Sequence, residues 1–179
     1  MYLDRDGVLV RSDVRDGKPF AVAKARDMEV FAEAPAAVAS LKALGFVTIV
    51  ATNQPDIATG KLEQAELDAM HRTLAGRIAL DDILVCPHAD ADQCECRKPK
   101  PGLLREAARR HNIDLKTSFV VGDRWRDVEA GRAAGCITIF VDRGYRETLR
   151  GPADHMVADV GEAANVIARL IRADSGDGR

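Results

Sequence analysis

Two aspartates separated by a single residue, Asp4 and Asp6, lie near the start of the chain, and Gly7 follows them directly. If Tyr2 and Leu3 end a buried strand, both acids lie where the chain leaves the sheet, and residues i and i+2 share one face of a strand. Two carboxylates this close repel each other unless a cation or a shared proton compensates them, and Mg²⁺ prefers such oxygen ligands. Gly7 permits a turn that a Cβ atom would resist. The pair therefore indicates either a metal-assisted reaction site or an acidic turn after a short strand.

The elements that would position these acids are alternating strand-like and helix-like segments. Apolar runs of strand length predict strands at residues 46–51, 83–85, 118–121 and 137–141, with an edge strand at 155–158. Helical periodicity, with Pro35 in a first turn, predicts helices at 36–44, 63–80, 104–111 and 127–134 and a closing helix from residue 160. This alternation is typical of an α/β fold with a doubly wound, Rossmann-like parallel sheet and helices on both faces.

A chain of 179 residues can bury a sizeable core and indicates one domain, which we expect at residues 1–173 with a frayed polar tail at 174–179. Residues 12–30 show no clear periodicity and contain a turn signal at Asp16-Gly17, so we expect a long loop. The chain leaves no room for more than a minimal cap. Only three residues precede Asp4, which is short for a central strand, so the first strand is either natively short or trimmed at its start.

Right-handed crossovers bring the carboxyl ends of parallel strands to one rim of the sheet, where ligands bind. The polar residues that follow the expected strands are Asp4 and Asp6, Thr52 and Asn53, Asp123, and Lys98 on the connection after the third strand. Each has an ordinary structural explanation, because threonine caps helices, lysine is usually a solvated charge and aspartate suits a turn. Together, the acids, the hydroxyl and the ammonium predict a site that binds an electrophile.

A second cluster lies in the loop at residues 86–96, where Cys86, His88, Cys94 and Cys96 match a Cys₃His zinc set. Four protein ligands leave no open coordination position, so this zinc would be structural. The alternative is a chance cluster of buried thiols. The remaining cysteine, Cys136, precedes an apolar strand and is expected to be a small buried residue.

Four motifs, in order, resemble the signature motifs of the haloacid dehalogenase superfamily: Asp4-x-Asp6-Gly7-Val8, Thr52-Asn53, Lys98-Pro99 and Gly122-Asp123-x-x-x-Asp127. The resemblance implies a Mg²⁺-dependent phosphatase in which Asp4 takes the phosphoryl group and Asp6 is the general acid and base. It also implies that Thr52 and Lys98 hold phosphate oxygens. Mg²⁺ would be bound by Asp4, Asp6 and Asp123, while Asp127 would orient Lys98 or a water on the metal.

The charge of a phosphate monoester makes these roles necessary. An ionised Asp4 cannot approach a dianionic phosphate unless Mg²⁺ and Lys98 neutralise it. Attack by Asp4 would give an aspartyl-phosphate, and Asp6 would protonate the leaving alcohol and later accept a proton from water. Because Arg97 and Lys98 follow the last zinc ligand directly, we expect the zinc loop to hold both cations over the phosphate.

The zinc-loop pattern Cys-x-His…Cys-x-Cys-Arg-Lys-Pro resembles one branch of this superfamily. That branch contains D-glycero-D-manno-heptose-1,7-bisphosphate 7-phosphatases and histidinol-phosphate phosphatase domains. The resemblance makes removal of the heptose 7-phosphate the leading reaction and histidinol phosphate the alternative substrate. Two features depart from the heptose type: Pro55-Asp56 replaces the usual Ser-Gly, and the zinc loop is short, as in the histidinol-phosphate type. The resemblance and the expected pocket together imply substrate contacts for Asn53, Arg97, Ser12 and Arg15.

Composition limits the other partners. A net charge of −2 and the lack of a lysine or arginine block argue against nucleic acid or an anionic membrane as the main partner. The apolar runs are too short to span a bilayer, and no signal peptide precedes Asp4. We therefore expect a cytoplasmic monomer that acts on a small phosphorylated sugar or a related metabolite.

Two alternatives belong to other classes of protein. A receiver-like phosphoacceptor module also combines Asp, Lys, a hydroxyl and Mg²⁺ in a doubly wound fold, but its acceptor aspartate follows the third strand, where this chain has Cys86. An inactive scaffold that keeps only the zinc loop would have no need of the acids and the lysine. Release of phosphate over many turnovers distinguishes an enzyme from both.

Overall fold

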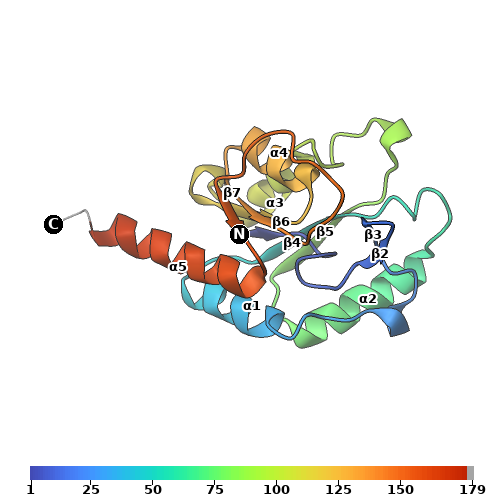
Figure 1. The fold of residues 1–179 in the computed structure, drawn as a ribbon, viewed down its shortest axis with the longest axis horizontal. Helices are drawn as coiled ribbons and strands as arrows, with labels where there is room; N and C mark the ends of the chain where they lie inside the picture. The colour runs from blue at the N-terminus through green and yellow to red at the C-terminus, as the bar shows by residue number, and fades with distance from the viewer. Residues whose placement is uncertain (177–179) are drawn as a thin grey trace.

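A parallel sheet of six strands forms the centre of the computed structural model, which describes residues 1–176 (Figure 1). From one edge to the other, the strands are β5 (Asp82–Cys86), β4 (Ile49–Asn53), β1 (Tyr2–Leu3), β6 (Phe119–Gly122), β7 (Ile137–Val141) and β8 (His155–Val157). Every neighbouring pair is parallel, so the carboxyl ends of all these strands meet at one rim. The predicted doubly wound α/β fold is confirmed.

Helices cover both faces of the sheet (Figure 1). On one face lie α1 (Ala34–Ala43), α2 (Gln64–Arg77) and α5 (Val160–Gly176), and on the other lie α3 (Gly102–His111) and α4 (Trp125–Ala134). Short 3-10 turns are η1 (Ala25–Asp27), η2 (Asp90–Asp92) and η3 (Leu115–Thr117). Pro35 lies in the first turn of α1 as predicted, where its missing N–H is not needed.

Two hydrophobic clusters, one on each face, attach the helices to the sheet. In β1, Leu3 packs with α1, α2 and α5, whereas its neighbour Tyr2 packs with α3 and α4. Ile49 and Val50 in β4 divide between the same two clusters, as alternating strand residues must. Burial on both faces explains why these strands appear in the sequence as continuous apolar runs.

The strand predicted at residues 46–51 is displaced toward its carboxyl end. Its pairing begins at Ile49 and continues through Thr52 and Asn53, because those two residues pair with β5. Phe46 instead packs edge-on against Phe119, with ring centroids 5.7 Å apart. Thr52 and Asn53 are therefore held by the end of the sheet itself.

The segment predicted as a long loop, residues 12–30, contains a β-hairpin, so that prediction was wrong. Strands β2 (Asp13–Arg15) and β3 (Lys18–Phe20) pair antiparallel. Asp16 and Gly17 connect them with φ angles of 51° and 73°, the left-handed conformation that two-residue hairpins favour. Strands this short cannot display an alternating pattern, and only the Asp-Gly turn signals them in the sequence.

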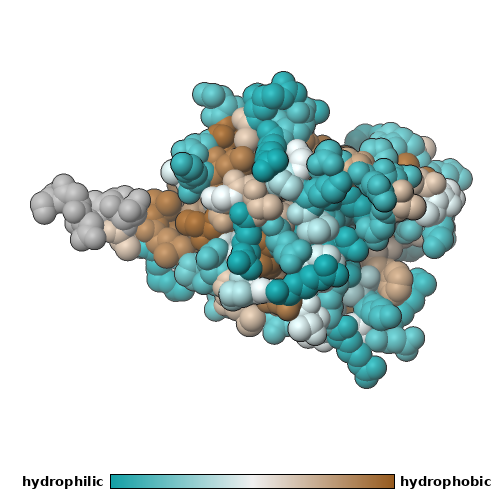
Figure 2. All heavy atoms as spheres, turned by 90° about the horizontal axis from the view of Figure 1, so that it is seen from above, coloured by the Kyte–Doolittle hydropathy of each residue, from teal (hydrophilic) through white to brown (hydrophobic). Residues whose placement is uncertain are grey.

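The C-terminal helix α5 continues to Gly176. The frayed tail predicted from Asp174 is thus helical at its start, and its remainder at residues 177–179 lies outside the described residues. Seen from above, the surface is largely hydrophilic, with hydrophobic residues gathered toward the end of α5 (Figure 2). None of the helices within residues 1–176 combines the length and apolar character needed to cross a bilayer.

Candidate active site

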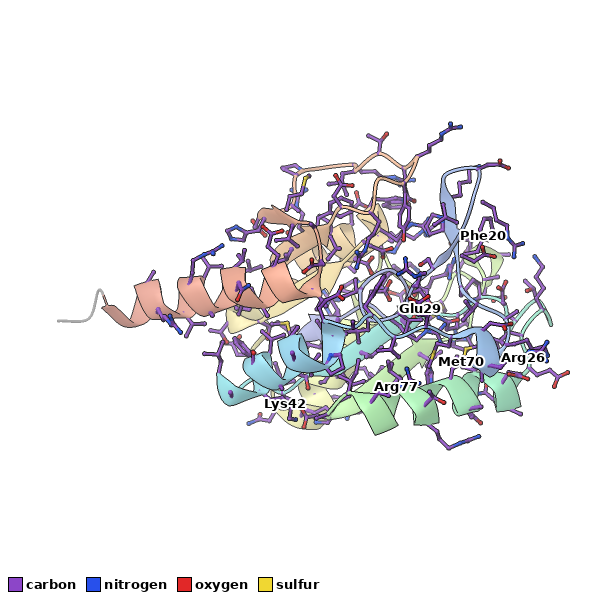
Figure 3. The ribbon with its side chains drawn as sticks, turned by 60° about the horizontal axis from the view of Figure 1, so that its bottom comes forward. Phe20, Arg26, Glu29, Lys42, Met70 and Arg77 are labelled. Carbon is purple, nitrogen blue, oxygen red and sulfur yellow. The ribbon has the colours of Figure 1, made fainter. Side chains whose placement is uncertain are left out.

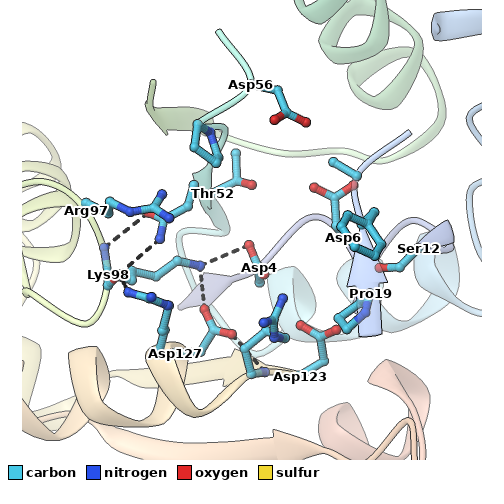
Figure 4. A pocket seen from close by; sticks show the side chains of 16 residues that line it. Asp4, Asp6, Ser12, Pro19, Thr52, Asp56, Arg97, Lys98, Asp123 and Asp127 are labelled. Carbon is cyan, nitrogen blue, oxygen red and sulfur yellow. Dashed lines mark hydrogen bonds and ion pairs between the residues drawn. The ribbon is translucent and has the colours of Figure 1, made fainter. Parts of the chain in front are cut away.

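The side chain of Lys98 connects the acids at the rim of the sheet (Figure 4). Its Nζ lies 3.0 Å from Asp4 Oδ1, forms an ion pair with Asp127 and donates a hydrogen bond of 2.7 Å to the Ala51 carbonyl. Burial by itself would lower the pKa of Lys98, but the carboxylates of Asp127 and Asp4 raise it above its ordinary value. Lys98 is therefore a buried, fixed ammonium beside Asp4.

Asn53 holds the backbone of Lys98. Its Oδ1 accepts a hydrogen bond of 3.1 Å from the Lys98 N–H, and its Nδ2 donates one of 3.1 Å to the Lys98 carbonyl. Asn53 lies at the end of β4, so the sheet determines where Lys98 lies. Both ends of the Asn53 amide thus bind the backbone of Lys98. The predicted contact of Asn53 with substrate stays a prediction.

Three carboxylates gather where β1 and β6 end. Asp4, Asp123 and Asp127 each offer an oxygen within 4.8 Å of the others. Burial, opposed by Lys98, raises the pKa of Asp4 to about 6. The pKa of Asp123 is raised well above its ordinary value by burial and then by the charges of Asp4 and Asp127. Asp123 Oδ1 is buried without a hydrogen-bond donor among the described residues. An oxygen-rich cluster with excess negative charge fits a hard divalent cation such as Mg²⁺.

Two glycines allow this cluster to form. Gly7 has a φ of +82°, and a Cβ atom there would lie 1.8 Å from Asp123 Oδ2. A Cβ at Gly122 would lie 2.1 Å from the Cβ of Asp127. The carboxylates can approach the backbone only because both positions lack a side chain.

The carboxylate of Asp6 lies outside this cluster, although Asp6 was predicted as a Mg²⁺ ligand with Asp4 and Asp123. It accepts hydrogen bonds from Arg5 and from Gln54 Nε2, the latter at 2.8 Å. Gln54 Nε2 also donates to Thr52 Oγ1 at 3.0 Å. Since Thr52 Oγ1 accepts from Gln54, its own proton is free to point elsewhere.

A pocket of about 330 Å³ opens over these groups. Among the residues predicted for the site, it is lined by Asp4, Asp6, Ser12, Thr52, Asn53, Arg97, Lys98, Asp123 and Asp127. Pro55 and Asp56, noted above as a departure from the heptose type, also line it. Residues that the sequence reasoning did not single out complete it: Pro19, Phe20, Ala21, Arg124 and Arg126. Arg124 and Arg126 lie within the fourth motif, between Asp123 and Asp127, and these positions could have suggested them.

Arg15 does not line this pocket. Its side chain is 70% exposed on β2, where Nε donates a hydrogen bond of 2.8 Å to Asp13. Alternation along the hairpin points it away from the site, while Ser12, just before the hairpin, is buried at the pocket wall. Arg15 lines a neighbouring hollow that shares Ser12 and Ala21 with this pocket, so its predicted substrate contact stays a prediction.

The zinc loop brings its four donors together. Cys86 Sγ lies 3.6 Å from Cys94 Sγ and 3.1 Å from Cys96 Sγ, and His88 Nδ1 lies 3.3 Å from Cys96 Sγ. A tetrahedral zinc with bonds of about 2.3 Å separates its sulfur ligands by about 3.8 Å, so the thiols lie slightly closer together than a bound ion would hold them. Cys136 is buried elsewhere. The Cys₃His set therefore fits a closed tetrahedral site.

The loop also contacts the pocket. Asp90, in its 3-10 turn, accepts a hydrogen bond of 2.8 Å from Arg97 Nε and one of 3.2 Å from Arg126 Nη1. One carboxylate thus steadies two guanidinium groups that line the pocket.

Comparison with known proteins assigns the chain to a family. The HAD-hydrolase-like family model matches residues 95–163. The D-glycero-beta-D-manno-heptose-1,7-bisphosphate 7-phosphatase of Bordetella bronchiseptica is 37% identical over 166 residues, which cover 83% of this chain and 84% of that protein. The chain belongs to the haloacid dehalogenase-like (HAD-like) family of hydrolases. The predicted resemblance is confirmed, and this HAD-like protein is a phosphatase.

Two further comparisons support the assignment of this HAD-like phosphatase. The Pseudomonas aeruginosa protein of the same name is 42% identical over 115 residues, covering 60% of this chain and 64% of that protein. A crystal structure of D,D-heptose 1,7-bisphosphate phosphatase from B. bronchiseptica, complexed with magnesium and phosphate, superposes with a TM-score of 0.81. That structure is 32% identical, and the match covers 95% of this chain and 98% of that one. A receiver-like module and an inactive scaffold find no support in these matches.

Proposed function

We propose that this phosphatase removes the 7-phosphate of D-glycero-β-D-manno-heptose 1,7-bisphosphate in a Mg²⁺-dependent reaction through an aspartyl-phosphate on Asp4. The observation that carries the proposal is the ammonium of Lys98, paired with both Asp4 and Asp127 at the base of the pocket. The substrate is suggested by the names of the relatives.

The reaction would proceed in two displacements at phosphorus. An Asp4 oxygen bonds to phosphorus while the bond between phosphorus and the sugar oxygen breaks, and Asp6 donates a proton to that oxygen. Water then attacks the aspartyl-phosphate and gives its proton to Asp6. Inorganic phosphate leaves, and the Asp4 carboxylate is restored.

The surrounding groups would hold the phosphate. Lys98 supplies positive charge, and the Thr52 hydroxyl, which accepts from Gln54, can donate its proton to a phosphate oxygen. Asp4 and Asp123 would hold Mg²⁺, whereas the carboxylate of Asp6, the third predicted ligand, lies outside their cluster. The ion would supply the charge that stabilises the equatorial oxygens. Asp127 keeps Lys98 in place.

A bisphosphate substrate needs a second cationic region for the phosphate that is not cleaved. Arg97, Arg124 and Arg126 line the pocket and provide it. Guanidinium groups suit this task because their planar donors match phosphate oxygens. The zinc loop, with zinc held by its three cysteines and His88, would keep the side chains of Arg97 and Lys98 in position at the pocket.

Histidinol phosphate is the second candidate because the zinc loop at residues 86–96 is short. It carries one phosphate, so it would leave the arginine-rich side of the pocket without a partner. This difference favours the bisphosphate.

A phosphate-release assay tests the proposal. We would compare both anomers of the heptose bisphosphate, histidinol phosphate and other sugar phosphates at equal concentration, with and without Mg²⁺. The β-anomer is expected to give the highest kcat/KM, with no turnover in the absence of Mg²⁺. A preference for histidinol phosphate would reverse the choice of substrate, and metal-independent turnover would contradict the mechanism.

A further inference from the structure

Arg5 lies between the two reactive aspartates in the sequence, yet its side chain has no exposed surface. A guanidinium removed from water needs a carboxylate and further acceptors, since an unpaired buried charge is strongly destabilising. The proposed reaction gives this cation no role, so its partners indicate what it does.

One side of the Arg5 guanidinium grips the carboxylate of Asp6. Arg5 Nη2 donates to Asp6 Oδ1 at 3.1 Å and to Asp6 Oδ2 at 2.9 Å, and Nε donates to Oδ2 at 3.2 Å. Gln54 Nε2 reaches the same Oδ2 at 2.8 Å from β4. A planar fork and a second donor together restrict rotation of the carboxylate far more than a single hydrogen bond would.

The other side of the guanidinium is held by helix α2. Arg5 Nη1 lies 3.3 Å from His71 Nε2 and 3.8 Å from Met70 Sδ. Arginine can only donate, so His71 Nε2 is the acceptor and the imidazole is neutral, with its proton on Nδ1. Met70 is fully buried on the inner side of α2 (Figure 3). The helix therefore anchors Arg5, and Arg5 anchors Asp6.

We propose that Arg5 is a positioning residue that fixes the carboxyl group of Asp6 for proton transfer to the leaving oxygen, and that His71 holds Arg5 in turn. This inference rests on the proposed role of Asp6 as general acid. The inference predicts that loss of Arg5 affects some substrates more than others. Displacement of the Asp6 carboxyl group slows phosphoryl transfer from substrates whose leaving oxygen needs a proton, whereas p-nitrophenolate leaves readily without one.

The test compares kcat/KM for two substrates, the best alkyl phosphate from the screen above and p-nitrophenyl phosphate. For Arg5→Lys, which keeps the charge but loses the fork, we expect a loss of roughly 10²-fold for the alkyl phosphate and of at most about threefold for p-nitrophenyl phosphate. His71→Gln should show the same selectivity with a smaller loss. Arg26→Lys is the matched control, because Arg26 projects into solvent (Figure 3) and its side chain is 84% exposed.

Asp6→Asn separates this inference from the proposed function. If Asp6→Asn lowers both substrates equally, the role of Asp6 as general acid is wrong. If Asp6→Asn is selective but Arg5→Lys is not, or if Arg5→Lys has no effect, the role of Arg5 is overturned. The double variant should lose no more than Asp6→Asn alone. Should Arg5→Lys fail to fold, His71→Gln decides, since it removes the residue that holds Arg5, and equal losses for both substrates would overturn the role of Arg5. Gln54→Met measures the effect of losing the other donor to the Asp6 carboxylate.

Discussion

The carboxylate of Asp4 is buried beside the carboxylates of Asp6 and Asp127. Burial has the largest effect on the pKa of Asp4 and raises it, Lys98 lowers it, and Asp127 and Asp6 raise it further. A site arranged in this way stabilises the reaction at the expense of the folded state.

Asp4→Asn tests this balance. We expect turnover to fall by at least about 10³-fold, because the proposed mechanism transfers the phosphoryl group to Asp4. In metal-free buffer at pH 8 the melting temperature should stay the same or rise, because a raised pKa means that the ionised form destabilises the fold above pH 6. Phosphate release and thermal unfolding measure the two effects. A variant that kept turnover would contradict the assignment of Asp4 as the nucleophile.

Gly7→Ala tests the close approach of Asp123. Gly45 has a similar φ of +88° but no atom within 4 Å of its would-be Cβ, so Gly45→Ala is a matched control for backbone strain alone. We expect Gly45→Ala to cost about 1–2 kcal/mol in unfolding free energy. Gly7→Ala should cost more and should also weaken Mg²⁺ activation, since the new Cβ displaces the Asp123 carboxylate. Equal effects in both variants would mean that the contact does not matter.

At the scale of elements, the zinc loop and the hairpin complete a pocket that the sheet alone leaves open. The loop joins β5 to α3 and carries Asp90, which pairs with Arg97 and Arg126. The hairpin contributes Pro19 and Phe20 to the wall. Both elements are short, so their conformation depends on turn geometry and on ligands more than on buried area.

Removal of one of the four predicted zinc ligands should therefore disturb catalysis at a distance. We expect Cys94→Ala to lose zinc and to lower kcat by about 10-fold or more, because Lys98 follows the loop closely. Cys136→Ala is the control, since Cys136 is buried outside the ligand set. Metal content from mass spectrometry and kcat at saturating Mg²⁺ measure the effect. Full activity in a zinc-free Cys94→Ala protein would separate the loop from catalysis.

For the whole molecule, the contact between α2 and the segment after β1 makes folding sensitive to acid. Burial, followed by the charge of Arg5, lowers the pKa of His71 from 6.5 to about 4. Between these values the unfolded chain binds a proton that the folded chain does not. Stability should therefore fall as the pH drops from 6.5 toward 4.

Urea unfolding across this pH range provides the measurement. His71→Gln should show a shallower loss of unfolding free energy than the native chain between pH 6.5 and 4. His155→Gln, on the edge strand β8, controls for the removal of one histidine. Parallel curves for the native chain and His71→Gln would show that this imidazole does not titrate with folding.

Local patterns in the sequence were sufficient for the alternation of strands and helices, the zinc set, and the acids, hydroxyl and lysine at the rim. These features follow from short-range rules, because apolar runs locate the strands to within a few residues and parallel strands end at one edge. Only the tertiary structure decided where the side chains point beyond the strands. It placed Asp127 rather than Asp6 beside Asp4 and Asp123, turned Arg15 to solvent and folded Arg5 back onto Asp6. Those directions depend on partners dozens of residues away, among them His71 and Gln54, and on the positive φ of Gly7, so spacing along the chain does not encode them.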